Sequence, residues 1–120
     1  MQRLLVIEHD PEVRCSLQQI LQAEGYSVLA AANGQEGLRL FRVVCIDLVI
    51  INLQIPEMDG WELIRQFHLI RLTTKIIAMT GDQENEQDLA VNSYLGDHMM
   101  LHKPFSQQTL LELVRRQLAS

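Results

Sequence analysis

Short aliphatic runs alternate with helix-like stretches along the chain, and this pattern predicts an α/β fold. Runs of this length bounded by turn residues are typical of buried parallel strands. The most apolar run ends at Ile51, so we expect it at the centre of the sheet. The predicted strands are Arg3–Ile7, Ser27–Ala31, Asp47–Ile51, Lys75–Met79 and His98–His102.

Apolar residues at helical spacing predict a helix after each strand. Pro11 suits a first helical turn, and Gly25 ends that first helix. The other helices are predicted from Asn33-Gly34 through Leu38, Leu40 and Phe41, after the turn Pro56–Gly60 through Leu63, Ile64, Phe67 and Ile70, over Gln87–Tyr94 before Gly96, and over Gln107–Leu118 after a Ser106 cap.

Strict alternation of strands and helices with short connections implies one parallel sheet with helices on both faces. The chain has 120 residues, about the commonest domain size. We therefore expect a single domain over residues 1–120, with no sequence left for an output domain.

Polar residues follow four of the predicted strands. Glu8-His9-Asp10 follow the first, Asn52 the third and Thr80-Gly81 the fourth, and Lys103 follows the fifth. The carboxyl ends of parallel strands meet in one crevice, where ligands of open α/β sheets bind. The sequence therefore gathers carboxylates, a histidine, an amide, a hydroxyl and an ammonium group in one place.

Composition narrows the class of protein. A hydrophobic fraction of 48% with three prolines argues against disorder, and a net charge of -5 without a basic block argues against nucleic-acid binding. No membrane span or signal peptide is recognisable. Cys15 and Cys45 form no CxxC pair, so we expect two reduced, half-buried thiols and a cytoplasmic protein.

Four segments together resemble the response-regulator receiver domains of two-component signalling and phosphorelays. They are Val6–Pro11, Asp47–Gly60 with its Pro-Glu-Met-Asp-Gly turn, Met79–Gly81 and Lys103–Phe105. The resemblance covers essentially the whole chain. It implies a flavodoxin-like, five-stranded sheet in the order 2-1-3-4-5, and a cis Lys103-Pro104 peptide.

The resemblance also implies a role for each crevice residue. Asn52 takes the place of the aspartate that accepts a phosphoryl group from a histidine kinase. Glu8, His9 and Asp10 correspond to the acidic pocket that helps to hold Mg²⁺. Thr80, Gly81 and Lys103 correspond to the phosphoryl-binding residues, and Thr80 and Met100 to the switch positions, where Met100 replaces the usual aromatic residue.

The departures at Asn52 and His9 change the expected chemistry. A neutral amide lacks the nucleophilic oxygen that phosphoryl transfer requires. Mg²⁺ prefers carboxylate oxygens, whereas imidazole suits zinc, copper or nickel, so Mg²⁺ should bind weakly or not at all. Glu8 and Lys103 can nearly neutralise the crevice without a cation. We therefore interpret the chain as a pseudo-receiver, degenerate at the phosphoacceptor.

Other histidines in this region have simpler interpretations. His98 and His102 recur at i, i+4, which in a strand keeps them far apart, so we expect no metal site there. His9 could replace the phosphoacceptor or bind a transition metal, but a polar histidine at a sheet edge more often only forms hydrogen bonds. Trp61 is either partly exposed packing or a binding anchor.

We expect a signalling module that works by protein–protein contact with a histidine kinase or a downstream protein. The expected contact face is the fourth helix, fifth strand and fifth helix, where a homodimer is also an open alternative. No nucleophile–base pair and no glycine-rich phosphate loop are present, so we expect no enzymatic activity and no cofactor. The alternatives are a conventional phosphoaccepting regulator whose acceptor was replaced and a flavodoxin-like protein that binds a small ligand.

Overall fold

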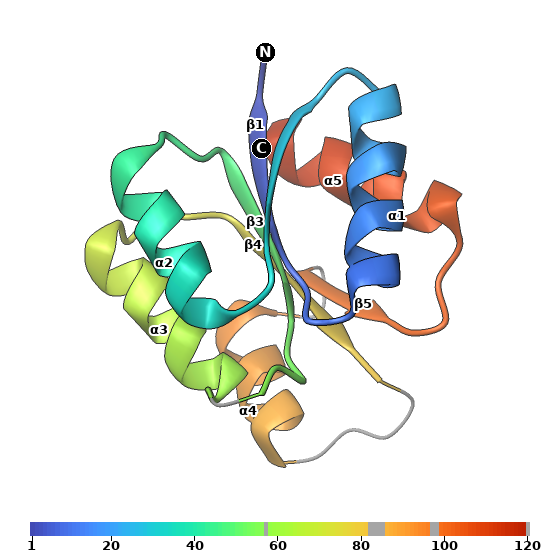
Figure 1. Cartoon of the computed structure of the whole chain (residues 1–120). Helices are drawn as coiled ribbons and strands as arrows, with labels where there is room; N and C mark the ends of the chain where they lie inside the picture. The colour runs from blue at the N-terminus through green and yellow to red at the C-terminus, as the bar shows by residue number, and fades with distance from the viewer. Residues whose placement is uncertain (57, 82–85, 97–98, 120) are drawn as a thin grey trace.

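A five-stranded parallel sheet forms the centre of the molecule (Figure 1). The computed structural model describes residues 1–56, 58–81, 86–96 and 99–119. The strand order is β2-β1-β3-β4-β5, which confirms the predicted topology. The strands are β1 (Arg3–Ile7), β2 (Ser27–Ala31), β3 (Leu48–Asn52), β4 (Ile76–Thr80) and β5 (Met100–His102).

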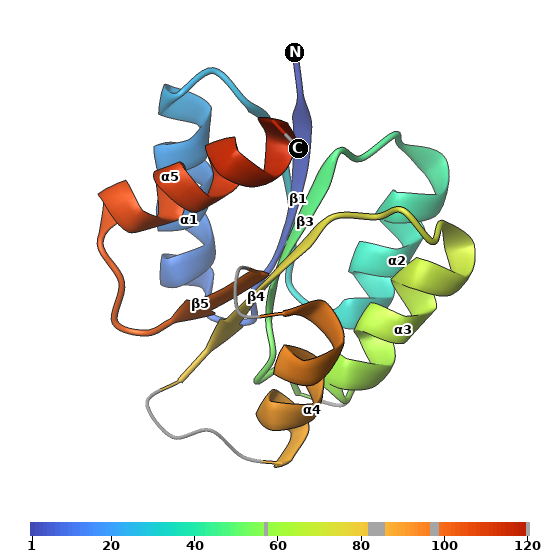
Figure 2. The ribbon, with the colours of Figure 1, turned by 180° about the vertical axis from the view of Figure 1, so that it is seen from behind.

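Helices cover both faces of this sheet, as Figures 1 and 2 show from opposite sides. Two helices lie on one face, and the other three lie on the opposite face. The first pair is α1 (Pro11–Ala23) and α5 (Gln107–Ala119); the second group is α2 (Gly34–Val43), α3 (Gly60–Ile70) and α4 (Glu86–Leu95).

The alternation of side chains along each strand divides the core into two layers. In β1, Leu5 and Ile7 pack under α2, α3 and α4, whereas Leu4 and Val6 pack under α1 and α5. All five residues of β3 are buried, because this strand is covered on both faces and paired on both edges. Its position at the centre is the one that its apolar sequence predicts.

Three strands begin or end away from the predicted residues. β3 and β4 each begin and end one residue later than predicted, so that Asn52 and Thr80 belong to the strands themselves. β5 begins at Met100 because Met99 still bonds through its N–H to the carbonyl of Gly96 (3.1 Å). His98, where the strand was predicted to start, lies outside the described residues.

Ile70, the last apolar position named for the predicted helix, is 41% exposed. Arg71 follows it, and its guanidinium lies 5.0 Å from the Phe41 ring and bonds to the Ile46 carbonyl (2.6 Å). One prediction about burial was wrong: Cys15 and Cys45 are both free and exposed rather than half-buried. Cys15 lies on the outer side of α1, and Cys45 lies in the α2–β3 connection.

Short polar residues begin the helices, and glycines end two of them. Asp10, Asn33 and Asp59 accept N–H groups from the first turns of α1, α2 and α3, and Ser106 does so for α5 through the N–H of Thr109 (3.0 Å). Gly25 and Gly96 adopt φ of 96° and 92°, as their predicted place after a helix requires. No helix in the described ranges is long and apolar enough to cross a membrane.

Asp10 allows a direct test of the cap. Its Oδ1 accepts the N–H groups of Glu12 (2.9 Å) and Val13 (3.4 Å). Asp10→Ala should lower the free energy of unfolding by about 1 kcal/mol, measured by urea denaturation. Asp10→Asn, which keeps the accepting oxygen without the charge, should stay within about 0.5 kcal/mol of the parent protein. Equal losses in both variants would show that charge, and not capping, is what matters.

Candidate functional site

The carboxyl ends of β1, β3, β4 and β5 bring the predicted site residues together. Ile7 is in register with Ile51, Asn52 with Met79 and Thr80 with His102. Glu8, Asn52 and Thr80, which end or follow three of these strands, are all buried. The strand register therefore places these predicted site residues at one edge of the sheet.

Glu8 is a buried carboxylate, only 2% exposed. Its Oε1 accepts the N–H of Asp10 (3.2 Å), and its Oε2 is buried with no hydrogen-bond partner in the described part of the chain. A buried carboxylate oxygen without a partner is costly, so a nearby cation would stabilise it. Glu8 therefore supplies one oxygen that a metal ion could use.

His9 and Asp10, the other two residues of the predicted acidic pocket, are exposed. Asp10 is engaged as the cap of α1. The loop is held instead by Arg14, whose Nη1 donates to the main-chain carbonyls of Glu8 (2.9 Å) and His9 (3.2 Å). Sequence analysis missed Arg14, although an arginine in the first turns of a helix that follows a polar loop is a usable signal.

The remaining donors do not complete a metal site. Among the described residues, no group of three or more histidine, cysteine, aspartate or glutamate side chains lies close enough to hold a metal ion. Mg²⁺ prefers an octahedron of hard oxygens with at least one or two carboxylates. The crevice offers the Glu8 carboxylate and neutral oxygens, so its residues do not fit a tightly bound Mg²⁺.

Asn52 ends β3 and is 7% exposed. Its Oδ1 accepts the main-chain N–H of Gln54 (3.0 Å), and this contact identifies the amide oxygen. The side chain therefore holds the start of the β3–α3 loop. An amide at this position is uncharged, and its nitrogen is a hydrogen-bond donor without a basic lone pair.

Thr80 ends the next strand, β4, one residue after Met79, the register partner of Asn52, and is fully buried. Its Oγ1 lies 2.9 Å from Nδ1 of His102, and its main-chain carbonyl accepts the N–H of Lys103 (2.9 Å). Gly81 and Lys103 are half-buried beside it, and the Lys103-Pro104 peptide is cis, as the resemblance implied. Sequence analysis assigned no role to His102 beyond the rejected metal pair.

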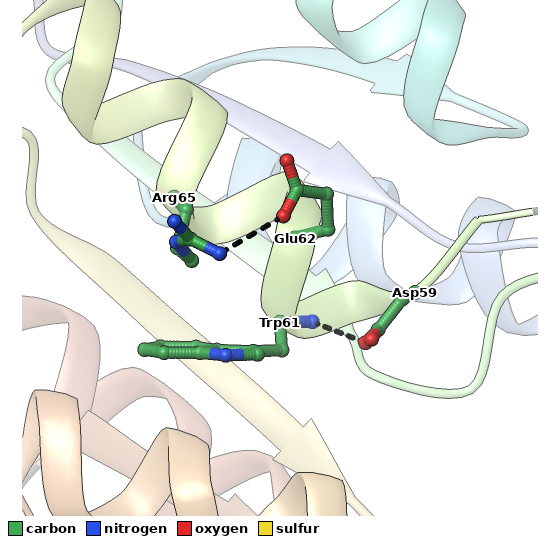
Figure 3. Close-up of polar contacts among 4 residues, drawn as sticks. All are labelled: Asp59, Trp61, Glu62 and Arg65. Atoms are coloured by element: carbon green, nitrogen blue, oxygen red, sulfur yellow. Dashed lines mark hydrogen bonds and ion pairs between the residues drawn. The ribbon is translucent and has the colours of Figure 1, made fainter.

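The loop after Asn52 is fixed by close contacts. A Cβ on Gly60 would lie 2.9 Å from the Leu53 carbonyl oxygen, so only glycine fits here without a shift of the main chain. The same carbonyl accepts Nε2 of Gln87 (3.0 Å), which ties α4 to this loop. Asp59 accepts the N–H of Trp61 (2.9 Å) at the start of α3 (Figure 3).

Trp61 is half-buried and joins α3 to α4. Its ring packs edge-on against Tyr94 (4.9 Å between centroids), and the Tyr94 hydroxyl lies 2.7 Å from Nδ1 of His68. Nε2 of His68 lies 2.9 Å from the Thr74 carbonyl, which can only accept, so Nε2 carries a proton. Arg65 pairs with Glu62 (3.3 Å) beside the Trp61 ring (Figure 3).

Met100, at the predicted switch position, is 7% exposed and belongs to the core layer under α2, α3 and α4. Its side chain is therefore already buried in the core in this structure. Exposed apolar side chains occur instead around the end of α3, in two places. Leu69, Leu72 and Tyr94 line a groove of about 260 Å³ with Trp61 and His68, whereas Val43 and Ile70 line a second hollow beside the end of α2.

Known proteins resemble this chain over nearly its whole length. Residues 4–115 match the response regulator receiver domain family. The cell cycle transcriptional regulator CtrA of Caulobacter vibrioides is 29% identical over 112 residues, and the cell cycle response regulator CtrA of Brucella ovis is 28% identical over 109. Each match includes 91% of this chain but 47% of the relative, so the chain spans about half the length of these curated relatives.

Solved structures agree with the sequence matches. A receiver domain protein from Methanospirillum hungatei superposes with a TM-score of 0.91 at 29% identity, covering 99% of this chain and 94% of that one. The response regulator TrrA from Thermotoga maritima, solved in complex with Mg(2+)-BeF, gives 0.85 at 31% identity and covers 98% and 99%. From its sequence and its fold, this chain belongs to the response regulator receiver domain family.

Proposed function

We propose that this receiver domain signals through protein–protein contact without phosphorylation at residue 52. The observation that carries the proposal is the buried Asn52 amide, whose oxygen already accepts the N–H of Gln54. Phosphoryl transfer to a side chain requires an oxygen nucleophile that can keep the phosphoryl group. The carboxamide has no ionised oxygen to offer. The proposed role is therefore that of a pseudo-receiver.

Residues 9 and 10 also weaken the expected metal site. His9 is exposed and Asp10 caps α1, so Glu8 is the single buried carboxylate of the described crevice. A divalent cation would face one negative charge where Mg²⁺ sites usually supply more. We propose that Mg²⁺ binds weakly or not at all, that no other cofactor is needed, and that the domain has no enzymatic activity of its own.

The partner in this proposal is a protein, either a histidine kinase or a downstream signalling protein. The exposed apolar side chains at the end of α3 support it, because clustered apolar surface is typical of interaction sites. Within the α4–β5–α5 face predicted earlier, Leu89 of α4 is 54% exposed, while Met100 is buried. A homodimer through that face and a cytoplasmic location remain parts of the proposal, as does the absence of nucleic-acid and membrane binding.

A second candidate function is a conventional phosphoaccepting regulator in which asparagine replaced the acceptor. The retained Thr80, Lys103 and receiver fold favour it, since they are the parts of the phosphoryl site that the chain keeps. The exposed His9 and the capping role of Asp10 count against it, because they depart from that site independently of residue 52.

Acetyl phosphate separates the two candidates. After incubation with acetyl phosphate and Mg²⁺, intact-mass spectrometry should show no phosphoryl adduct on the protein. The fluorescence of Trp61, in the first turn of the helix that follows the crevice loop, should not be quenched. A stoichiometric adduct that peptide mapping places on His9 or Asp10 would overturn the proposal.

Two substitutions test the metal argument. Asn52→Asp should restore at most slow labelling by acetyl phosphate, because His9 still leaves the metal site one carboxylate short. Asn52→Asp combined with His9→Asp should label at least about tenfold faster at the same Mg²⁺ concentration, the change produced by about 1.4 kcal/mol at the transition state. Equal rapid labelling of both variants would show that position 9 does not limit the metal site.

A further inference from the structure

We propose that His102 is a positioning residue that holds the Thr80 hydroxyl against β5 and so withholds it from the crevice. The starting observation is the 2.9 Å contact between Thr80 Oγ1 and His102 Nδ1. The proposal rests on the proposed function, a receiver domain that is not phosphorylated at residue 52, and adds how its threonine hydroxyl is held. Its test is separate, because no step in it requires phosphorylation.

The strand register makes this contact a fixed feature of the sheet. Thr80 and His102 are direct partners across the parallel β4–β5 pair, so their side chains project on the same face. The face is the one covered by α2, α3 and α4, since Ala78 and Met100, two residues earlier on each strand, pack in that layer. The Thr80 carbonyl also accepts the N–H of Lys103. Consecutive residues of one chain segment therefore hold both the main chain and the side chain of Thr80.

The contact matters energetically because Thr80 is buried. The residue is fully buried, so its hydroxyl cannot turn to bulk water, and an unmade hydrogen bond at this position is costly. His102 is exposed. The ring can therefore be replaced without opening the core, which makes the contact accessible to mutation.

A threonine hydroxyl has a single proton to donate. The proposal assigns the accepting role in this pair to Nδ1 of His102, with the ring proton on Nε2. The Thr80 O–H then donates to His102. An oxyanion that enters the crevice beside Lys103 must break this bond before it can receive the same proton.

The charged residues at this end of the sheet come from three elements. Lys103 follows His102 directly, Asp88 is buried in the first turns of α4 on the same face of the sheet, and Glu8 is buried at the end of β1. In the described part of the chain, the hydrogen-bond partner of Thr80 Oγ1 is Nδ1 of His102. The proposal therefore depends on one side chain.

The test uses three variants of the full chain. His102→Leu removes the accepting atom, and His102→Asn places an amide oxygen near the position of Nδ1. His9→Leu is the matched control, because it removes the other exposed histidine of the crevice. Three-bond couplings of the Thr80 methyl carbon report its χ1 angle, and nitrogen chemical shifts of the imidazole report which ring nitrogen of His102 carries the proton. Sulfate, whose charge is constant near neutral pH, serves as the oxyanion.

The parent protein, His102→Asn and His9→Leu should each show one Thr80 rotamer, and Nδ1 of His102 should be unprotonated in the parent. His102→Leu should show averaged couplings at Thr80 and should bind sulfate about fivefold more tightly, the scale of one neutral hydrogen bond. Unchanged Thr80 couplings in His102→Leu, or a proton on Nδ1 in the parent, would overturn the proposal. Equal sulfate responses in the parent and His102→Leu, including none in either, would contradict the competition for the hydroxyl.

Discussion

The chemistry of the site is constrained by the limited charge that the buried ends of the parallel strands can hold. β3 is covered on both faces and paired on both edges, and Asn52 at its end is almost as buried as the core. Carboxylates brought together in such a place need a cation, because each one loses its hydration. With Asn52 in place, Glu8 is the one buried carboxylate of the described crevice residues. An aspartate at residue 52 would add a second buried charge at this edge of the sheet, which a cation would have to offset.

Asn52 is also part of a series of contacts that connects the crevice to α4. Asn52 bonds to the loop that follows it, and that loop is in turn held by Gln87 from α4. On the outer side, the Trp61–Tyr94–His68 contacts fasten α4 to α3. Direct protein contacts therefore connect the loop after Asn52 to α4, and α4 to α3.

Much of the fold could be predicted from the sequence, because the strands are short, apolar and regularly spaced. The order of strands followed from the family resemblance, and the convergence of Asn52, Thr80 and Lys103 followed from the parallel topology. The cap at Ser106 is local, so neighbouring residues reveal it, and Asn33-Gly34 marked the start of the second helix. Asp10 was nevertheless assigned to the acidic pocket, since the sequence cannot show which of two uses a carboxylate will take.

Side-chain contacts between strands could not be predicted from the sequence. The bond between Thr80 and His102 depends on the register of β4 against β5, and a shift of one residue would place the two side chains on opposite faces. Arg14 and Arg71 bind main-chain carbonyls, which no residue pattern identifies in advance. Exposure of Ile70 and Cys15 depends on where a helix leaves the sheet and how it is rotated, and the apolar pattern fixes these only roughly.

The central claim is that a neutral amide at the end of β3 leaves this receiver fold without a phosphoacceptor. Fluorine NMR with beryllium, excess fluoride and Mg²⁺ addresses it most directly, because beryllofluoride mimics a phosphoryl group bound to a carboxylate. We expect only the signals of free beryllofluoride species in the presence of the protein. A protein-bound signal that disappears in Asn52→Ala would contradict the account.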